Sequence, residues 1–426
     1  MNLMAKSRAG IAIAVVAIGT TISGAQSISG RWDATVTIAG TAIPFRLDVS
    51  GDEKDLTGTL YNGAEKETTT SANVENGAVV LHFDHYLTTI TAIPKDGRLE
   101  GKVEGRFEAD KYIGSYPFEA KPYSAPVPTG VSVPSIAGNW EVPFESAKGE
   151  KSWRFIVQQS GPDVSAAILR VDGDTGALTG TYHDGQFVLS HFDGSRPLVV
   201  RVTPAKDGTL EILLSGAYVP TDKLIAYRPE VARAKGLPEP ANYTTHTTVR
   251  DANEPFAFSF PDVNGKIVSN TDAKFKNKVV LAIVTGTWCP NCHDEAQYLV
   301  QLYKKYHDQG LEIVALDFEE PEQQDSLKRE RAFIKQYDVP YTYLIAGAPT
   351  EMWEKVPQAV NLNTWPATFF IGRDGLVENI HAGFAAPASG EFNQQLKAEF
   401  TGNIERLLAQ KPGELTTASA AVKGSE

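Results

Sequence analysis

The two cysteines of this chain lie three residues apart, in the segment Trp288-Cys289-Pro290-Asn291-Cys292. A chain of 426 residues with no other thiol does not use its cysteines for a framework of structural disulfides. Three kinds of chemistry need two sulfurs at one place: thiol–disulfide exchange, thioether attachment of a haem, and half of a zinc site. The elements that position the two sulfurs distinguish among the three.

From about Phe256 onward, the pattern alternates between strands and helices. Apolar, β-branched runs predict strands at Val279–Thr285, Leu311–Phe318, Tyr341–Ile345, Thr368–Ile371 and Leu376–Ile380. Helical patterns follow the cysteines as far as Gly310 and also cover 322–337 and 391–408. Such alternation predicts a central mixed sheet with helices on both faces, an α/β domain.

A strand that leads through a tight turn into a helix places Cys289 at the helix N-terminus. There, free backbone N–H groups and the positive end of the helix dipole favour the thiolate, which is the attacking species in disulfide exchange. Cys292, one turn later, can then resolve the mixed disulfide. Pro290 suits the first helical turn, where its missing N–H has no partner to lose. This mechanism requires reachable sulfurs, and sulfurs sequestered in the interior would contradict it.

Three further residues near the cysteines have more than one interpretation. Glu295, on the helix face of Cys292, can exchange a proton with that thiol or simply stabilise the helix dipole. His293 is either a charged neighbour of the thiols or a solvated residue, and base rates favour the solvated one. Pro366 directly precedes an apolar strand, a position where its lack of an N–H removes no hydrogen bond from the sheet. By itself the sequence favours a trans bond there, because only about 5% of X–Pro bonds are cis.

Residues 255–410 resemble the TlpA/ResA-like thiol–disulfide oxidoreductases, a thioredoxin-fold family of exported proteins. The matching pieces are FSFPDVNGKIVS, KNKVVLAIVTGTWCPNCHDEAQYL, GLEIVALDFEE and TWPATFFIGRDGLV. The resemblance implies that Cys289 attacks, that Cys292 resolves, that Glu295 is the active-site carboxylate and that Pro366 is a cis-proline facing the disulfide. Ile283 stands where thioredoxin itself has a buried aspartate, which leaves proton handling to Glu295.

The resemblance also implies the substrates and partners. We expect protein thiols and disulfides as substrates, an upstream dithiol protein as electron donor, no metal, and no cofactor besides the Cys289–Cys292 disulfide itself. A reductase is the direction that the family suggests. The residues expected to contact the substrate are Trp288, Pro290, Asn291, Trp365 and Pro366. Trp365 is bulkier than the residues common before this proline, so we expect an unusually shaped groove.

The first half of the chain repeats itself and has the pattern of β structure. Ile28–Trp32 returns as Ile136–Trp140, Leu-Thr-Gly-Thr at 56–59 returns at 178–181, and Val80–Asp84 returns within 188–193. Short alternating stretches separated by Gly, Asn-Gly and Asp-Gly predict two all-β antiparallel repeats, barrel- or sandwich-like, lying side by side or fused. The opening Gly-x-Trp of each copy resembles the start of lipocalin-like barrels.

The predicted organisation is therefore multidomain. Its parts are a signal peptide (1–25), β repeat 1 (26–121), a Pro-rich linker (122–135), β repeat 2 (136–228), a second linker (229–254), the thioredoxin-like redox domain (255–410) and a flexible tail (411–426). The signal is indicated by Lys6 and Arg8 before the apolar run Ala9–Ile18, with small residues at Ser23-Gly24-Ala25. The apolar run is too short to span a bilayer, which needs about 20 residues, so we expect export, to the periplasm, without a stable membrane span.

Other functions compete with disulfide exchange. Cys289-x-x-Cys292-His293 also fits a c-type haem, with His293 and Met352 as axial ligands, although haem attachment of this kind usually opens an all-helical domain. Zinc lacks a second Cys/His pair. A peroxiredoxin would need Thr or Ser where Gly286 stands. A formal net charge of −12 with no Lys/Arg block argues against nucleic acid.

The β repeats suggest a non-catalytic alternative, in which the protein mainly binds or docks a partner. Their histidines and aspartates could also suggest a metal site, but scattered polar residues at strand ends are usually solvated, and we expect no metal. These residues are His82, Asp84, His85, His183, Asp184, His191 and Asp193.

Overall fold

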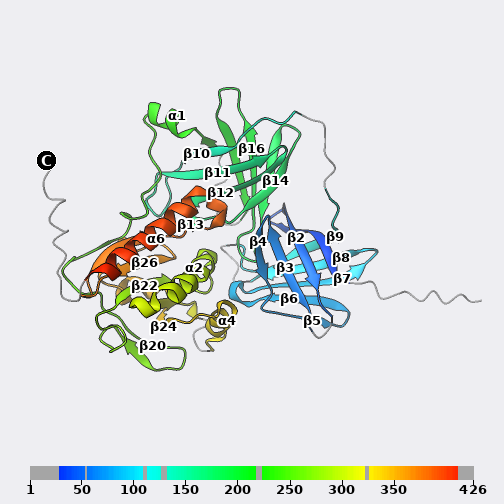
Figure 1. Cartoon of the computed structure of the whole chain (residues 1–426). Coiled ribbons are helices and arrows are strands. Elements are labelled where there is room, and N and C mark those ends of the chain that lie inside the picture. The colour runs from blue at the N-terminus through cyan, green and yellow to red at the C-terminus, as the bar shows by residue number, and fades with distance from the viewer. Residues whose placement is uncertain are drawn as a thin grey trace, which may run out of the picture.

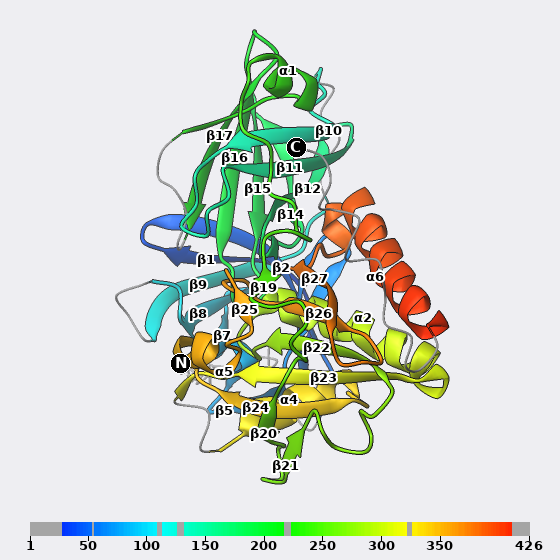
Figure 2. The ribbon, with the colours of Figure 1, turned by 90° about the vertical axis from the view of Figure 1, so that its left-hand side faces the viewer.

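The computed structural model describes residues 28–52, 55–108, 113–125, 132–216, 223–321 and 326–410. The predicted signal peptide, the predicted tail and residues 126–131 of the Pro-rich linker lie outside the described residues. The chain forms two antiparallel β modules and an α/β domain, which pack against one another (Figures 1 and 2).

The first β module is a single antiparallel sheet in the order β4-β3-β2-β1-β9-β8-β7-β6-β5. Its strands are β1 (Gly30–Ile38), β2 (Thr41–Ser50), β3 (Thr57–Asn62), β4 (Glu65–Thr68), β5 (Ser71–Glu75), β6 (Ala78–Phe83), β7 (Thr88–Lys95), β8 (Arg98–Gly105) and β9 (Gly114–Pro122). Alternate residues of β1, from Trp32 to Ile38, are buried, because successive side chains of a strand point to opposite faces. The sheet curls around this apolar face (Figure 1), and the core there also includes Phe192 and Val199 of the second β module.

The second β module closes on itself. Its strands are β10 (Gly138–Pro143), β11 (Ser152–Ser160), β12 (Asp163–Arg170), β13 (Gly173–Asp174), β14 (Leu178–His183), β15 (Gln186–His191), β16 (Leu198–Pro204), β17 (Leu210–Gly216) and β18 (Leu224–Ala226). Adjacent strands pair in the order β10-β11-β12-β14-β15-β16-β17-β18, and β13 pairs with β12. The N–H groups of Glu141 and Tyr227 each donate to the other residue's carbonyl, at 2.8 and 2.9 Å, which joins the two ends of this order into a barrel.

The repeated sequence pieces are only partly equivalent in the structure. The indole N–H of Trp32 donates to the carbonyl of Ile28, and that of Trp140 donates to the carbonyl of Ile136, so each opening segment fixes its tryptophan in the same way. The two Leu-Thr-Gly-Thr pieces differ. The first leads into β3, the third strand counted from β1 along its sheet, whereas the second opens β14, the fourth strand counted from β10. The two four-residue pieces therefore do not occupy the same position.

The C-terminal domain has a central sheet in the order β24-β23-β22-β26-β27. Its elements are β22 (Val279–Thr285), α2 (Pro290–Tyr306), β23 (Leu311–Phe318), α4 (Lys328–Tyr337), β24 (Thr342–Gly347), α5 (Met352–Lys355), β26 (Ala367–Ile371), β27 (Val377–Ala382) and α6 (Glu391–Ala409). Strands β22, β23 and β24 are parallel to one another, β26 is antiparallel to β22, and β27 is antiparallel to β26. This is the thioredoxin-like arrangement, and β22 and β23 have the predicted bounds.

The helices differ from the prediction in their distribution over the sheet. We expected helices on both faces, but α2, α4 and α6 all contribute to one core on one face of the sheet, through Leu299, Phe333 and Phe400 among others. The short helix α5 and the segment around Phe256–Phe275 cover the other face, with β19 (Thr248–Val249), β20 (Ser259–Pro261), β21 (Ile267–Ser269) and β25 (Ala359–Val360) nearby. Non-helical segments can therefore supply a cover that the strand–helix pattern assigned to helices.

The predicted linker at 229–254 is a packed connection. It opens with the helix α1 (Pro229–Ala234), and farther on the carbonyl of Tyr243 accepts a hydrogen bond from the N–H of Ala382, at 2.9 Å. The Tyr243 hydroxyl also accepts from Arg154 of the second β module, at 2.6 Å. Ile156 and Leu169 of that module join the apolar core of the C-terminal domain. The second β module is thus docked on the C-terminal domain through apolar as well as polar contacts.

Candidate active site

Cys289 lies at the N-terminus of helix α2, directly after the buried strand β22. It is the N-cap residue of the helix, and its sulfur accepts a hydrogen bond from the N–H of Cys292 at 3.2 Å. Pro290 occupies the first helical turn. The free N–H groups of a helix start stabilise negative charge on a group placed there, and the first sulfur occupies that position.

The two sulfurs are not equivalent. Both cysteines are free thiols, 4% exposed at Cys289 and 1% exposed at Cys292. Burial, followed by the neighbouring Cys289 sulfur, raises the pKa of the Cys292 thiol well above its ordinary value. Cys292 therefore keeps its proton at neutral pH.

The segment before β26 faces the first sulfur. The Trp365–Pro366 peptide bond is cis, as the family resemblance implies. The Trp365 carbonyl oxygen lies 3.5 Å from the Cys289 sulfur. The rings of Trp288 and Trp365 are 5.4 Å apart, and the Trp288 indole N–H donates to the carbonyl of Phe318 at 2.9 Å. The structure thus brings together Trp288, Cys289, Trp365 and Pro366.

Glu295 is fully buried beneath the dithiol. Its carboxylate accepts a hydrogen bond from the Thr368 hydroxyl at 2.5 Å, which ties helix α2 to strand β26. Burial raises the pKa of Glu295 to about 8, and a negative charge on Glu295 would in turn raise the pKa of Cys292. A buried group that titrates near neutral pH beside a thiol can take up and return a proton.

His293 is buried, so the expectation of a solvated histidine was wrong. Nε2 lies 2.7 Å from the carbonyl oxygen of Thr287, which can only accept, so Nε2 carries the proton and donates it. In this neutral tautomer Nδ1 accepts a hydrogen bond from the Tyr337 hydroxyl at 2.7 Å. Burial lowers the pKa of His293 well below its ordinary value. With both ring nitrogens engaged, and with Met352 packed in the apolar core on the other face of the sheet, these two residues do not fit the axial ligands of a haem.

The surface next to Cys289 is covered by the second β module. Asn291, between the two cysteines, is 6% exposed, and its amide donates to the carbonyl of Asp172 at 2.8 Å. Its side-chain oxygen accepts from Arg196 at 2.9 Å. The prediction that the sulfurs must be reachable is thus not met in this conformation, because another module lies over the helix N-terminus.

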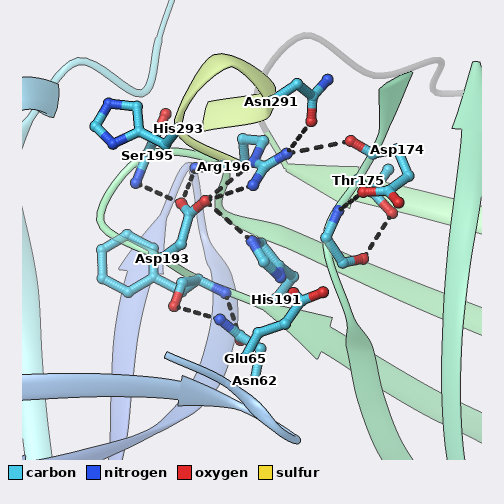
Figure 3. Close-up of polar contacts among 12 residues, drawn as sticks. Asn62, Glu65, Asp174, Thr175, His191, Asp193, Ser195, Arg196, Asn291 and His293 are labelled. Atoms are coloured by element: carbon cyan, nitrogen blue, oxygen red, sulfur yellow. Dashed lines mark hydrogen bonds and ion pairs between the residues drawn. The ribbon is translucent and has the colours of Figure 1, made fainter. Parts of the chain in front are cut away.

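A buried polar network links the two β modules to this helix (Figure 3). Asp193 lies at its centre, where it accepts two hydrogen bonds from the Arg196 guanidinium, at 2.8 and 3.0 Å, and lies 3.3 Å from His191. Asn62 of the first module bonds to the backbone of Phe192 on the second, and Glu65 accepts from the N–H of Ala177. Burial alone would raise the pKa of Asp193, but Arg196 and His191 hold it well below its ordinary value.

This network changes the interpretation of the polar residues in the β repeats. His85, His191 and Asp193 were expected to be solvated, but all three are buried at contacts between modules. His85 lies 5.1 Å from the ring of His293 and bonds to Gln336 of helix α4. The His191-x-Asp193 spacing could have indicated a paired site, but no feature of the sequence showed that the partner was the redox helix.

A separate acidic cluster lies where β23 ends. Among the described residues, Asp317, Glu319 and Glu330 are the group whose carboxylates approach closely enough to hold a metal ion. Arg329 already neutralises part of this charge, at 3.4 Å from Glu319, and the Thr287 hydroxyl also contacts Glu319. Burial raises the pKa of all three acids. The cluster has a counterion, and we assign it no metal.

An α/β sheet with two cysteines at a helix N-terminus and a cis-proline opposite the first sulfur defines a thioredoxin-like redox domain. The AhpC/TSA family model matches residues 252–380. Thiol-disulfide oxidoreductase ResA of a Bacillus cereus strain is 30% identical over 151 residues, which are 35% of this chain and 74% of that protein. Thioredoxin-like protein YneN of Bacillus subtilis (strain 168) is 29% identical over 135 residues, 32% of this chain and 73% of that protein. The chain therefore belongs to the family of the ResA thiol-disulfide oxidoreductases.

Solved structures also match part of the chain. The crystal structure of a putative thiol:disulfide interchange protein DsbE from Chlorobium tepidum has 24% sequence identity and a TM-score of 0.28, and covers 35% of this chain and 98% of its own. A secreted disulfide oxidoreductase of Mycobacterium tuberculosis has 20% identity and a TM-score of 0.26, and covers 33% of this chain and 95% of its own. Across the described residues, no helix is both long and apolar enough to cross a membrane.

Proposed function

We propose that this oxidoreductase exchanges disulfides with protein substrates through Cys289 and Cys292, and that it acts as a reductase outside the cytosol. One observation carries the proposal: the Cys289 sulfur caps helix α2, accepts the N–H of Cys292, and faces the Trp365 carbonyl before a cis-proline. A thiolate stabilised in this position is placed to attack an incoming disulfide.

The exchange proceeds in two balanced steps. The Cys289 thiolate attacks one sulfur of the substrate disulfide, a mixed disulfide forms, and the released substrate thiolate takes up a proton. Cys292 then loses its proton and attacks the Cys289 sulfur, which frees the second substrate thiol and leaves a Cys289–Cys292 disulfide. The substrate gains two electrons and two protons, and an upstream dithiol protein restores the enzyme by the same exchange.

Glu295 serves the second step in this proposal. The pKa of Cys292 is raised well above its ordinary value, so its proton needs an acceptor, and the carboxylate of Glu295 titrates at about 8 in the same buried region. Trp288, Pro290, Asn291, Trp365 and Pro366 form the proposed substrate contact around the first sulfur. The extracytosolic location rests on the basic and apolar pattern of residues 1–25, and cell fractionation tests it directly.

Single substitutions of the two cysteines test the chemistry. Cys289→Ser should abolish disulfide reduction, whereas Cys292→Ser should accumulate a mixed disulfide that mass spectrometry detects on Cys289. The absorbance spectrum of the purified protein supplies the check on haem, because a Soret band would contradict the thiol mechanism. Unchanged function in cells carrying Cys289→Ser would favour the binding role of the β modules over catalysis.

A further inference from the structure

A hairpin of the second β module lies across the proposed substrate contact. Strands β12 and β13 pair Arg170 with Gly173, which leaves Val171 and Asp172 at the tip. We call residues Val171–Asp174 the hairpin tip. On one side the Asp172 carbonyl accepts the Asn291 amide at 2.8 Å. Thus the tip bonds directly to the residue between the two cysteines.

The opposite side of the hairpin tip contacts the cis-proline side of the site. A Cβ atom on Gly383 would lie 2.4 Å from the Val171 carbonyl oxygen, and one on Gly173 would lie 2.6 Å from the Phe384 carbonyl oxygen. The N–H of Gly383 in turn donates to the carbonyl of Pro366 at 2.8 Å. The hairpin tip therefore contacts the side chain of the residue between the two cysteines on one side and the backbone of the segment after β27 on the other.

Two further polar contacts fasten the hairpin tip in place. One Nη atom of Arg196 donates to the carbonyl of Asp174 at 3.1 Å and to the side chain of Asn291 at 2.9 Å, while Asp193 holds the rest of the guanidinium (Figure 3). The Ser389 hydroxyl donates to the Asp174 carboxylate at 2.5 Å. Arg196 thus bridges the hairpin tip and the active-site helix.

The nature of these contacts allows the hairpin tip to move by itself. Ile156 and Leu169, at its base, belong to the apolar core of the redox domain and anchor the module. Val171 and Asp174 of the tip are themselves buried, but neither belongs to that apolar core, and water can replace the polar contacts of the tip when it moves away. The anchor can stay docked while the tip opens.

We propose that the hairpin tip, fastened by Arg196, determines which disulfides reach Cys289. In the closed position it excludes the disulfides of folded proteins, because disulfide exchange needs the attacking sulfur in line with the substrate S–S bond. Small disulfides and reagents pass more readily, and a protein disulfide reacts after the tip has moved away. This inference rests on the proposed function, since it concerns access to the same dithiol.

The test compares reagents of different size on the full-length protein. The reduced enzyme is treated with N-ethylmaleimide or with a maleimide carried on a polyethylene glycol chain, and the rate of Cys289 modification is followed by mass spectrometry. In parallel, exchange with oxidised glutathione is compared with exchange with a folded disulfide protein such as insulin. The wild type should react much faster with the small member of each pair.

Arg196→Ala removes the shared contact and should speed the reactions of the large reagent and of the protein disulfide by about ten- to a hundredfold, the effect expected for losing charge-assisted hydrogen bonds. The small reagents should gain less. Arg201→Ala, in β16 of the same module, is the matched control and should change neither rate.

A second variant is needed because Arg196→Ala leaves Asp193 without its cationic partner. In Gly173→Ala the new Cβ would lie 2.5 Å from the Asn291 amide nitrogen and push the tip away.

The outcomes separate the two proposals. Folded Arg196→Ala and Gly173→Ala variants, checked by circular dichroism, that react with protein disulfides at the wild-type rate would overturn the role of the hairpin tip. A wild type that reacts equally fast with small and large reagents would overturn it as well. Disulfide exchange that persists in Cys289→Ser would instead overturn the proposed function, whatever the effect of Arg196.

Discussion

Replacing Glu295 by glutamine should change how the stability of the protein depends on pH. The carboxyl group of Glu295 is fully buried and is held by the Thr368 hydroxyl, at 2.5 Å. Burial raises its pKa from 4.5 to about 8, because the charged form loses its hydration. Glutamine has nearly the same shape and its oxygen can still accept from Thr368, but it carries no proton to titrate.

The sign and size of the effect follow from proton linkage. Between the ordinary pKa of 4.5 and the folded pKa of about 8, the folded state holds the proton and the unfolded state has lost it. The stabilisation by this proton is complete below the unfolded pKa and is lost as the pH rises through the folded one. At about 1.4 kcal/mol for each pH unit, the wild type should lose about 4 kcal/mol relative to Glu295→Gln between about pH 5 and about pH 8.

Urea unfolding followed by tryptophan fluorescence measures this difference at a series of pH values. The matched control is Glu354→Gln, an exposed glutamate of helix α5 in the same domain, whose curve should run parallel to that of the wild type. If the curves of Glu295→Gln and the wild type also run parallel, Glu295 is ionised in the folded protein throughout this range. That result would refute the buried neutral state of Glu295.

Three further outcomes are expected. Glu295→Gln should slow the resolution of the mixed disulfide by about a hundredfold near neutral pH, because a positioned base usually contributes that much. Quenched-reaction mass spectrometry should show the mixed disulfide accumulating, and resolution at the wild-type rate would contradict this. Arg329→Met should lower stability by about 3–5 kcal/mol, more at high than at low pH, because it removes the cation that faces buried Glu319. The exposed neighbour Lys328→Met is the control, and equal urea midpoints for the two variants would refute the pairing. His293→Leu should lower stability by about 2–3 kcal/mol, because the buried carbonyl of Thr287 loses its donor; an unchanged melting temperature would show that water replaces the imidazole.

Much of the candidate site was visible in the sequence because its parts are local. Strand β22, the turn and helix α2 are contiguous, so the run Val279–Thr285 and the following helical stripe were enough to place Cys289 at a helix start. Glu295 lies on the same helix, one turn beyond Cys292. Gly310 was also correctly predicted as the end of this helical region, where its positive φ of 107° closes the last turn. Contacts within a few residues follow from backbone geometry and periodicity.

What the sequence could not supply were the contacts between modules. The partners of Asn291 are Asp172 and Arg196, which are 119 and 95 residues away in the chain. His293 faces His85, which belongs to the first β module. Residue types predict that a histidine or asparagine is usually solvated, but burial depends on which surface docks against it. The same limit explains the mistaken equivalence of the two Leu-Thr-Gly-Thr pieces, since strand pairing depends on neighbours that are distant in the chain.

The chain by itself thus determined the chemistry, through two sulfurs placed at the start of a helix by the strand before them. Only the tertiary structure decided whether a substrate can reach those sulfurs, because the hairpin tip Val171–Asp174 comes from another module. Local backbone geometry is encoded residue by residue. Access to the site depends on how separately folded surfaces fit together, which no local pattern records.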